Sequence, residues 1–439
     1  MSGRLEVAVV GSGPSGAYCV GELCETADLD VRIDVFERLP TPFGLVRYGV
    51  APDHEKIKSI TSSFDEIFED PKVRFFGNVR IGADVALEEL RQRYDAVILA
   101  HGARSDRTLN VDGEDQEGIH PARALVDWYS GHPDGRPDAL RFTTRSVVVI
   151  GAGNVALDVA RMLCRTPEEL RQTDVPEYVI EALAASSVTD VHVLARRGPA
   201  FAKYSNKELL ELAHMEDARV VIEPAEFELD VEQKALSDAN AQVRRRIEII
   251  KEVAESGRPD ASRRIHLRFG LAPETFLGDG HVSGVRCTSP RGEVDIDAGL
   301  VFRSIGFRSD PLEGVPFDPR TATVPNERGR VLDGSDTARG LYVTGWVKRG
   351  PSGVIGTNRR CAMETVEALL EDWRSGGIGG AGRPPHVSEV VTDGSGVVDW
   401  AGWRAIDNAE VAYGETLDRG RVKIHDLDDL LEHALRAKP

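Results

Sequence analysis

A strand, a glycine-rich loop and a helix occur twice in the same order in this chain, and this repeat constrains the fold most. The apolar run 5–10 leads into GSGPSG, a helical segment at 17–26 and a second apolar run at 31–37. The pattern restarts at 146–150, continues with GAGNVALDVARML and reaches another apolar run at 188–195. Strand, helix and strand in this order form a parallel β-α-β unit. The sequence therefore predicts an α/β fold with two Rossmann-like units.

The order of the segments predicts that one domain interrupts the other. A chain of 439 residues is too long for one ordinary core. A further glycine-rich loop, GWVKRGPSGVIGTN, comes late in the chain and is followed by a Gly/Pro-rich connection at 376–385. We expect residues 1–106 and 308–439 to form one domain, with a small α/β appendage from about residue 386. Residues 107–307 form the inserted domain in this interpretation.

The first loop has the composition of a dinucleotide-binding turn. Gly11, Gly13 and Gly16 follow the apolar run and open the expected helix. Glycines at these positions permit a tight turn and let a pyrophosphate approach the helix N-terminus. Glu37 ends the next strand, where a carboxylate accepts hydrogen bonds from a ribose diol. The alternative is a tight turn that binds no ligand.

The second loop predicts a different nucleotide. Gly151 and Gly153 are followed by Ala156, and Arg196 and Arg197 take the place of an acid at the end of the next strand. Guanidinium groups bind a 2′-phosphate, which a carboxylate repels. A solvated arginine pair at a strand end is the alternative. Two nested dinucleotide domains, as in glutathione reductase, predict FAD at the first loop and NADP(H) at the second.

Charge, hydropathy and cysteine usage exclude several classes of protein. The net charge of −18 argues against nucleic-acid binding, which needs a basic surface. No apolar run approaches the roughly 18 residues of a transmembrane helix. The first expected strand begins too early for a signal peptide to precede it, so we expect a cytoplasmic protein. The five cysteines have no metal-binding spacing, and Cys19 and Cys24 lie on different faces of one expected helix, so neither a metal nor a disulfide is predicted.

Longer motifs resemble a known family. GSGPSG, VFERLPTPFGLVRYGVAPDHEKIKSI at 35–60, GAGNVALDVAR, LARRGP and GWVKRGPSGVIGTN are together similar to adrenodoxin reductase and its bacterial ferredoxin–NADP reductase relatives. The resemblance runs from residue 5 to about residue 412. It implies that NADPH passes hydride to FAD, and that the flavin passes single electrons to a ferredoxin-type iron–sulfur protein. An oxygenase such as a cytochrome P450 is the implied final acceptor.

The resemblance also implies individual contacts with the two cofactors. The implied FAD contacts, besides the glycines of the first loop, are Ser15, Glu37, Leu45, Ile81, Trp346, Gly353, Val354 and Ile355. The implied NADP contacts, besides the second loop, are Asn154, Val155, Arg196, Arg197 and Glu208, with Gly353 also touching the nicotinamide.

A polar set is implied to act near the flavin. His54, Asp158 and Glu211 are expected to position the nicotinamide or relay protons, because hydride transfer leaves protons and charge to be managed. The alternatives are a loop histidine, a helix-pairing aspartate and a solvent-facing glutamate. His101, in AHGAR, departs from the small or apolar residue expected before that glycine, and we expect it to be a surface histidine.

Basic residues are the implied docking site for an acidic electron carrier. The candidates are Arg244, Arg245 and Arg246 on one expected helix, with Arg359 and Arg360 after the last glycine-rich loop. A solvated helix face is the alternative. The competing functions are a flavin monooxygenase, an electron-input subunit of a larger oxidoreductase, and a nucleotide sensor without turnover. A monomer is the expected oligomeric state.

Overall fold

The computed structural model describes residues 3–379 and 396–436, and the chain divides into two compact units. Unit 1 holds the described residues of 1–50, 54–105 and 307–439, and unit 2 holds 51–53 and 106–306. The chain thus changes unit within one residue of the expected positions at 106/107 and 307/308. The short excursion of 51–53 into unit 2 has no signal in the sequence pattern.

Unit 1 is built on a seven-stranded sheet in the order β16-β17-β18-β4-β1-β2-β3. Strands β18, β4, β1, β2 and β3 run parallel, and β16 and β17 form an antiparallel edge. The strands are β1 (Leu5–Val10), β2 (Val31–Phe36), β3 (Val73–Phe76), β4 (Ala96–Leu99), β16 (Asn326–Glu327), β17 (Arg330–Asp333) and β18 (Asp336–Val343). Two further short strands, β5 (Ser105–Asp106) and β15 (Phe307–Arg308), pair with each other.

Both faces of the unit 1 sheet are buried. Val7 and Val9 of β1 belong to one apolar cluster, and Ala8 and Val10 belong to another. Successive residues of a strand point to opposite faces, so burial of both faces explains why β1 is an unbroken apolar run. The helices are α1 (Pro14–Glu25), α2 (Leu45–Tyr48), α3 (Glu55–Lys58), α4 (Thr61–Phe68), α5 (Leu87–Arg93), α13 (Trp346–Arg349), α14 (Ile355–Ser375), α16 (Trp400–Thr416) and α17 (Leu427–Arg436).

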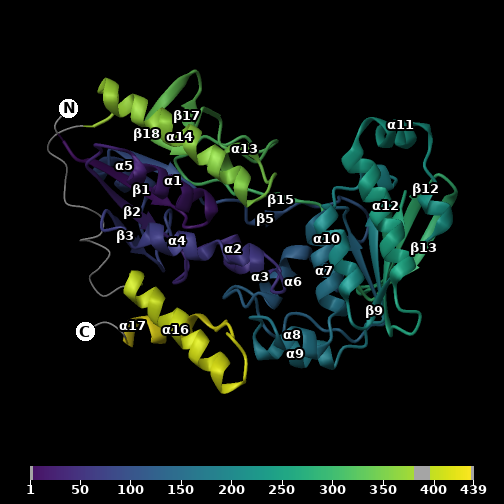
Figure 1. Ribbon diagram of the computed structural model, residues 1–439. Coiled ribbons are helices and arrows are strands. Elements are labelled where there is room, and N and C mark those ends of the chain that lie inside the picture. The colour runs from purple at the N-terminus through teal and green to yellow at the C-terminus, as the bar shows by residue number, and fades with distance from the viewer. Residues whose placement is uncertain (1–2, 380–395, 437–439) are drawn as a thin grey trace. The chain divides into compact units, whose positions relative to one another are not determined.

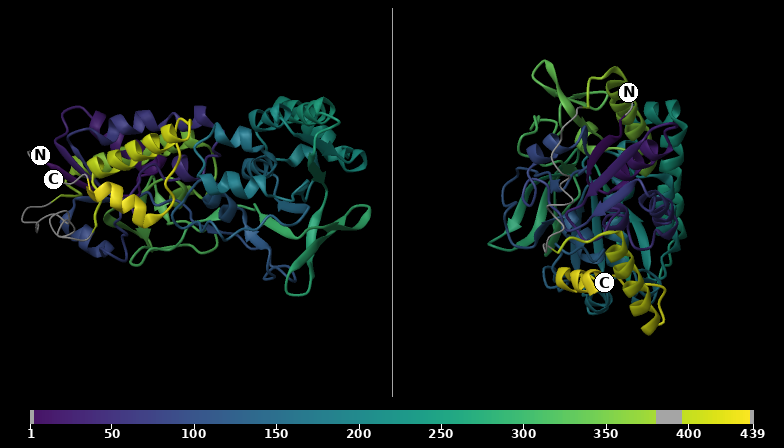
Figure 2. Two further views of the ribbon diagram at one scale, coloured as in Figure 1. Left: turned by 90° about the horizontal axis from the view of Figure 1, so that it is seen from below. Right: turned by 90° about the vertical axis from the view of Figure 1, so that its left-hand side faces the viewer.

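Helix α1 packs along α14, as Figure 1 shows. It begins three residues before the expected start, because Pro14 has the backbone angle that the first helical position needs. Helices α16 and α17, drawn in yellow in Figure 2, pack against each other. The expected α/β character of this appendage is wrong for its described part: 396–436 contains these two helices and only an isolated bridge from Val398 to Gly77.

Unit 2 has a six-stranded parallel sheet in the order β6-β14-β7-β8-β10-β9. A separate antiparallel sheet contains β11, β12 and β13. The strands are β6 (Ile119–Pro121), β7 (Ser146–Ile150), β8 (Asp190–Ala195), β9 (Ala218–Ile222), β10 (Arg263–Phe269), β11 (Ala272–Gly278), β12 (Val282–Ser289), β13 (Gly292–Asp297) and β14 (Leu300–Arg303).

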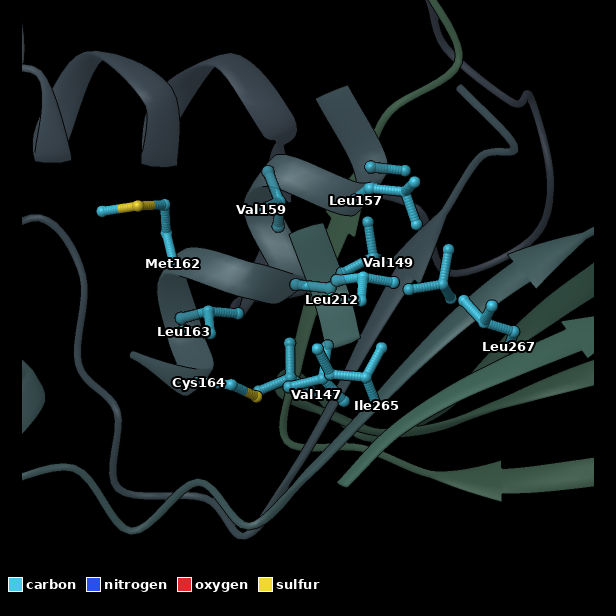
Figure 3. Packing of buried hydrophobic residues seen from close by; sticks show 14 of the residues in the cluster. Val147, Val149, Leu157, Val159, Met162, Leu163, Cys164, Leu212, Ile265 and Leu267 are labelled. Atoms are coloured by element: carbon cyan, nitrogen blue, oxygen red, sulfur yellow. The ribbon is translucent and has the colours of Figure 1, made fainter. Parts of the chain in front are cut away.

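Helix α7 covers the centre of this sheet. Figure 3 shows Leu157, Leu163 and Cys164 of α7 among side chains of β7 and β10. The helices of unit 2 are α6 (Ala122–Tyr129), α7 (Asn154–Cys164), α8 (Pro167–Arg171), α9 (Glu177–Ala184), α10 (Asn206–Glu211), α11 (Val231–Ala239) and α12 (Ala241–Ser256). All five cysteines are free thiols, as expected. Over 3–379 and 396–436, no helix is long and apolar enough to cross a bilayer.

Candidate functional site

The first glycine loop is fixed by contacts of its backbone. Gly11 has a φ of +107°, and a Cβ there would lie 2.7 Å from the carbonyl oxygen of Ala100 at the end of β4. A Cβ on Gly16 would lie 2.0 Å from the carbonyl oxygen of Gly11. No side chain fits at either position, so these two glycines are required by the fold itself.

Gly13 has a different role, because the fold leaves room for a side chain there. Its φ is −67°, and the nearest atom to a Cβ would be the Cα of Gly44 at 3.8 Å. The absence of a side chain at Gly13 therefore keeps the N-terminus of α1 open to a ligand. Beside it, Glu37 Oε2 accepts hydrogen bonds from the amide and hydroxyl of Ser12 at 3.0 and 2.8 Å. This open helix terminus beside an acid suits the pyrophosphate and ribose of FAD.

The late glycine-rich loop meets the first loop through Ser15. The hydroxyl of Ser15 donates to Asn358 Oδ1 at 3.1 Å, and a Cβ on Gly345 would lie 2.1 Å from that hydroxyl. Asn358 is the fourth residue of α14. Residues 343 positions apart in the chain are thus joined at the start of α1.

The other predicted FAD contacts lie in unit 1, on or beside this loop. Trp346 stacks on Phe307 with ring centroids 5.8 Å apart. Gly353 has a φ of +84°, and the side chain of Val354 is 72% exposed although it is apolar. An exposed valine in this glycine-rich loop provides an apolar surface that a bound flavin ring would cover. The remaining contacts are Leu45, the first residue of α2, the buried Ile81, and Ile355, the first residue of α14.

The second glycine loop repeats this design in unit 2. Gly151 has a φ of +152°, and a Cβ there would lie 2.2 Å from the carbonyl oxygen of Ser304, directly after β14. Gly153 has no atom within 4 Å of a Cβ position, so the fold does not require it. Asn154 begins α7, and its Oδ1 accepts from the amide of Ser205 at 2.8 Å. Val155 and Ala156 complete the first turn of this helix.

The arginine pair stands at the end of β8, beside the second loop. Gly151 donates its amide to the carbonyl of Leu194 at 2.9 Å, which places the end of β8 next to the loop. Arg196 and Arg197 are both exposed, and the guanidinium of Arg197 lies 4.4 Å from the ring centre of Phe201. Within the described part of the chain, neither arginine forms an ion pair with a carboxylate. Two uncompensated guanidinium groups at this position suit a 2′-phosphate.

Two contacts hold the segment that follows the arginine pair, and neither has a signal in the sequence. Lys203 donates its amide to the carbonyl of Ala152 in the glycine loop at 2.7 Å. Arg246, a docking candidate, instead donates from Nη1 to the carbonyl of Ala202. Its guanidinium therefore holds the segment that follows the arginine pair, a role that only tertiary contacts reveal.

Arg161 lies at the centre of a cluster of four acidic residues of unit 2. It is fully buried on α7, and its guanidinium donates to Asp53 at 2.7 and 2.9 Å and to Asp158 at 2.8 Å. Glu208 and Glu211 of α10 each approach its Nη1 to 3.6 Å. Asp158 and Glu211, two residues of the predicted catalytic set, therefore share one cation. The sequence pattern gave no signal for Arg161.

Arg161 and Asp53 each stabilise the charged form of the other. Burial raises the pKa of Asp53, but hydrogen bonds and charges from Arg161 and Arg165 outweigh it and hold that pKa well below its ordinary value. The carboxylates in turn raise the pKa of the Arg161 guanidinium although burial opposes its charge. Asp53 and Arg161 are thus both charged at neutral pH.

The two histidines of interest lie in unit 1. His54 is buried and precedes α3. The expectation of a surface histidine at position 101 is wrong. Both ring nitrogens of His101 are buried, and burial lowers the pKa of its imidazole. The backbone of His101 itself packs against the first glycine loop: its Cα would lie 3.1 Å from a Cβ on Gly11.

The two glycines Gly13 and Gly16 provide a direct test of this site. We expect Gly13→Ala to keep the thermal stability of the FAD-free protein but to weaken FAD binding at least tenfold, because the new methyl group lies in the open helix terminus. Gly16→Ala should lower the stability of the FAD-free protein, because its methyl group meets the backbone of the loop. Thermal unfolding and FAD titration measure the two effects. Equal behaviour of the two variants would contradict this division.

Arg161→Met should lower the free energy of unfolding by about 3–5 kcal/mol, because it leaves buried carboxylates without their cation. Urea denaturation followed by circular dichroism measures the change. The pKa of Asp53 in the folded protein lies below its ordinary value of 3.8, so the ionised carboxylate stabilises the fold at pH values above 3.8. This stabilisation is lost as the pH falls below 3.8. The difference between wild type and variant should therefore stay constant above about pH 4 and shrink as the pH falls below 3.8.

Arg171→Met is the matched control. Arg171 is exposed and pairs with Glu168 at 3.5 Å on the same helix, so its loss should change the free energy of unfolding by less than about 0.5 kcal/mol. A large effect of both variants, or a difference that does not depend on pH, would show that Arg161 contributes by packing and not by charge.

Comparison with known proteins gives the family of this chain. Residues 5–223 match the family described as pyridine nucleotide-disulphide oxidoreductase. The NADPH-ferredoxin reductase FprA of Mycobacterium leprae is 40% identical over 97% of both chains. The mitochondrial NADPH:adrenodoxin oxidoreductase of Arabidopsis thaliana is 37% identical over 98% of this chain and 95% of its own length.

A solved structure gives the same result for the fold. The FprA of Mycobacterium tuberculosis in complex with NADPH matches with a TM-score of 0.91 and 38% identity, over 99% of this chain and all of the other. The expected resemblance and the two-domain Rossmann-like α/β fold are confirmed. The chain belongs to the adrenodoxin-reductase type of ferredoxin–NADP reductases, a family of oxidoreductases whose cofactors are FAD and NADP(H).

Proposed function

We propose that this protein is a reductase that takes hydride from NADPH onto FAD and delivers single electrons to a ferredoxin-type iron–sulfur protein. The observation that carries the proposal is the difference between the two glycine loops. The first loop has Glu37 beside an open helix terminus, and the second has Arg196 and Arg197 in the corresponding place. Unit 1 is then the FAD domain and unit 2 the NADP domain.

FAD, when bound, accepts two electrons as hydride and releases them one at a time. The residues of this chain bind the two cofactors, orient them, and exchange the protons that accompany hydride transfer. The first turn of α1 holds the pyrophosphate and Glu37 the ribose, while Trp346, Gly353, Val354 and Ile355 border the flavin. Gly353 also touches the nicotinamide in this assignment.

We assign acid–base and positioning roles to the predicted catalytic set. His54, Asp158 and Glu211 orient the nicotinamide and exchange protons that accompany hydride transfer. The ion pairs of Arg161 keep Asp158 and Glu211 in place. On α7, Asn154 and Val155 bind the pyrophosphate side of NADPH, with Glu208 nearby on α10.

The electron carrier docks on basic residues in this proposal. Arg245 already pairs with Glu248 and Glu252, and Arg246 binds the carbonyl of Ala202, so both offer less free charge than the sequence suggests. Arg244 and Arg360 are exposed and carry more of the attraction, while Arg359 is exposed but pairs with Glu22 at 3.8 Å. Association should weaken as salt increases. An oxygenase such as a cytochrome P450 receives the electrons, and the enzyme acts as a cytoplasmic monomer.

The competing functions give different results in one experiment. The purified protein should be yellow, and anaerobic NADPH should bleach its flavin absorbance. A ferredoxin should then restore the colour and pass electrons to cytochrome c. A protein without flavin, or flavin that NADPH leaves unchanged, would support a nucleotide sensor. Oxygen consumption that requires an organic substrate, with no transfer to ferredoxins, would support a monooxygenase.

The arginine pair provides the prediction for nucleotide choice. Replacing Arg196 and Arg197 together by serine should raise the KM for NADPH at least tenfold, about 1.4 kcal/mol of binding. The KM for NADH should change much less, because NADH has no 2′-phosphate. Steady-state kinetics with both nucleotides measure this. Arg258→Ser, which alters an exposed arginine of the same unit, is the control. Equal losses for both nucleotides would contradict phosphate recognition.

A further inference from the structure

A buried carboxylate connects the C-terminal appendage to the short helix α2. Glu410 of α16 is fully buried. Its two carboxylate oxygens accept from the two terminal nitrogens of Arg47 at 2.5 and 3.1 Å. Glu410 also accepts from Arg421 and from the amide of Ile424, each at 3.0 Å. This carboxylate therefore accepts four hydrogen bonds, three of them from the guanidinium nitrogens of two arginines.

Arg47 is held by the appendage from several sides. Its guanidinium lies 5.1 Å from the ring centre of Trp403 on α16 and 5.0 Å from that of Tyr48. Its main-chain carbonyl accepts from the buried ammonium of Lys423 at 2.7 Å. The side chain and the backbone of one residue of α2 are thus both fixed by residues after position 396.

The other end of the same segment contacts the first glycine loop. The amide of Phe43 donates to the carbonyl of Ser12 at 3.3 Å. A Cβ on Gly44 would lie 3.1 Å from the Cα of Gly13, so the two backbones are in close contact. Gly13 is the residue whose missing side chain keeps the terminus of α1 open. The segment 43–48 therefore touches the dinucleotide loop at one end and the appendage at the other.

The backbone at the start of this segment is strained. Phe43 has a φ of +77°, which a bulky side chain adopts only when its surroundings force it. Its ring packs edge-on against Trp403 and Trp400, with centroids 5.7 and 6.3 Å away. Both tryptophans belong to α16, so the appendage also supplies the packing that keeps Phe43 in this conformation.

We propose that Glu410 is a positioning residue for FAD: docking of α16 through Glu410 and Arg47 sets the segment 43–48 against the dinucleotide loop. FAD affinity and docking of the appendage are then coupled, and the coupling is reciprocal. The proposal rests on the proposed function, because it takes FAD as the ligand of the first loop.

The first test measures FAD binding to the FAD-free full-length protein. Glu410→Gln keeps the size of the side chain but removes the charge that two cations, Arg47 and Arg421, share. We expect its dissociation constant for FAD, measured by flavin fluorescence, to rise at least tenfold. Binding of NADP+ to the same sample, measured by calorimetry, should stay within twofold of wild type, because unit 2 is unchanged.

Val331→Ala is the matched control for a loss of stability alone. Val331 is fully buried in β17 and belongs to the other apolar cluster of unit 1, not to the one that contains Phe43 and Val46. It should lower the melting temperature and leave FAD affinity within about twofold. If Glu410→Gln binds FAD as tightly as wild type, or if both variants weaken FAD equally, the proposal is wrong.

The second test needs no variant. In wild type, FAD should slow hydrogen exchange of the amides of α16 at least fivefold, because the coupling acts in both directions. Amides of β9 in unit 2 serve as the internal reference. Unchanged exchange in α16 on saturation with FAD would overturn the proposal. A wild-type protein that binds no FAD at all would instead overturn the proposed function.

Discussion

In both units, the first glycine of the loop packs directly against a carbonyl at the end of the neighbouring strand, and the rest of each site depends on this contact. Gly11 meets the carbonyl of Ala100, and Gly151 meets that of Ser304. In each case the partner strand lies on the opposite side of the central strand from the next strand of the β-α-β unit. The helix N-terminus is therefore directed at the point where the strand order reverses, which is where open parallel sheets bind ligands.

The buried arginines and the exposed arginines of this protein have different roles. Arg161 and Arg47 are buried, and each is surrounded by carboxylates or by a fully buried glutamate. A buried cation of this kind gives little net stability, since desolvation opposes the attraction, but it fixes the groups around it. Arg196 and Arg197 are exposed and unpaired within the described residues. The arginines that position other residues are thus buried, and those that are left to bind a ligand are open.

Several elements followed from the sequence because their cause is local. The apolar runs of β1 and β7 are buried on both faces. The glycine loops contain backbone conformations and close contacts that exclude residues with a side chain. Helix α1 begins three residues before the apolar pattern indicates, because Pro14 is favourable at a first helical position. The wrong expectation for His101 has a different origin. Its burial depends on the packing of β4 against the Gly11 loop, which residue type alone does not indicate.

The amino-acid sequence by itself determined the two dinucleotide loops, their order, and the acid or arginine that follows each of them. These features depend on residues within one β-α-β unit, where backbone geometry links composition to position. Only the tertiary structure decided which charges are neutralised and which segments support the loops. Glu410 and Arg47 are 363 positions apart, and Asp53 and Arg161 are 108 apart. Such pairs form only when the completed fold brings distant segments together and removes water from between them, so no local pattern in the sequence encodes them.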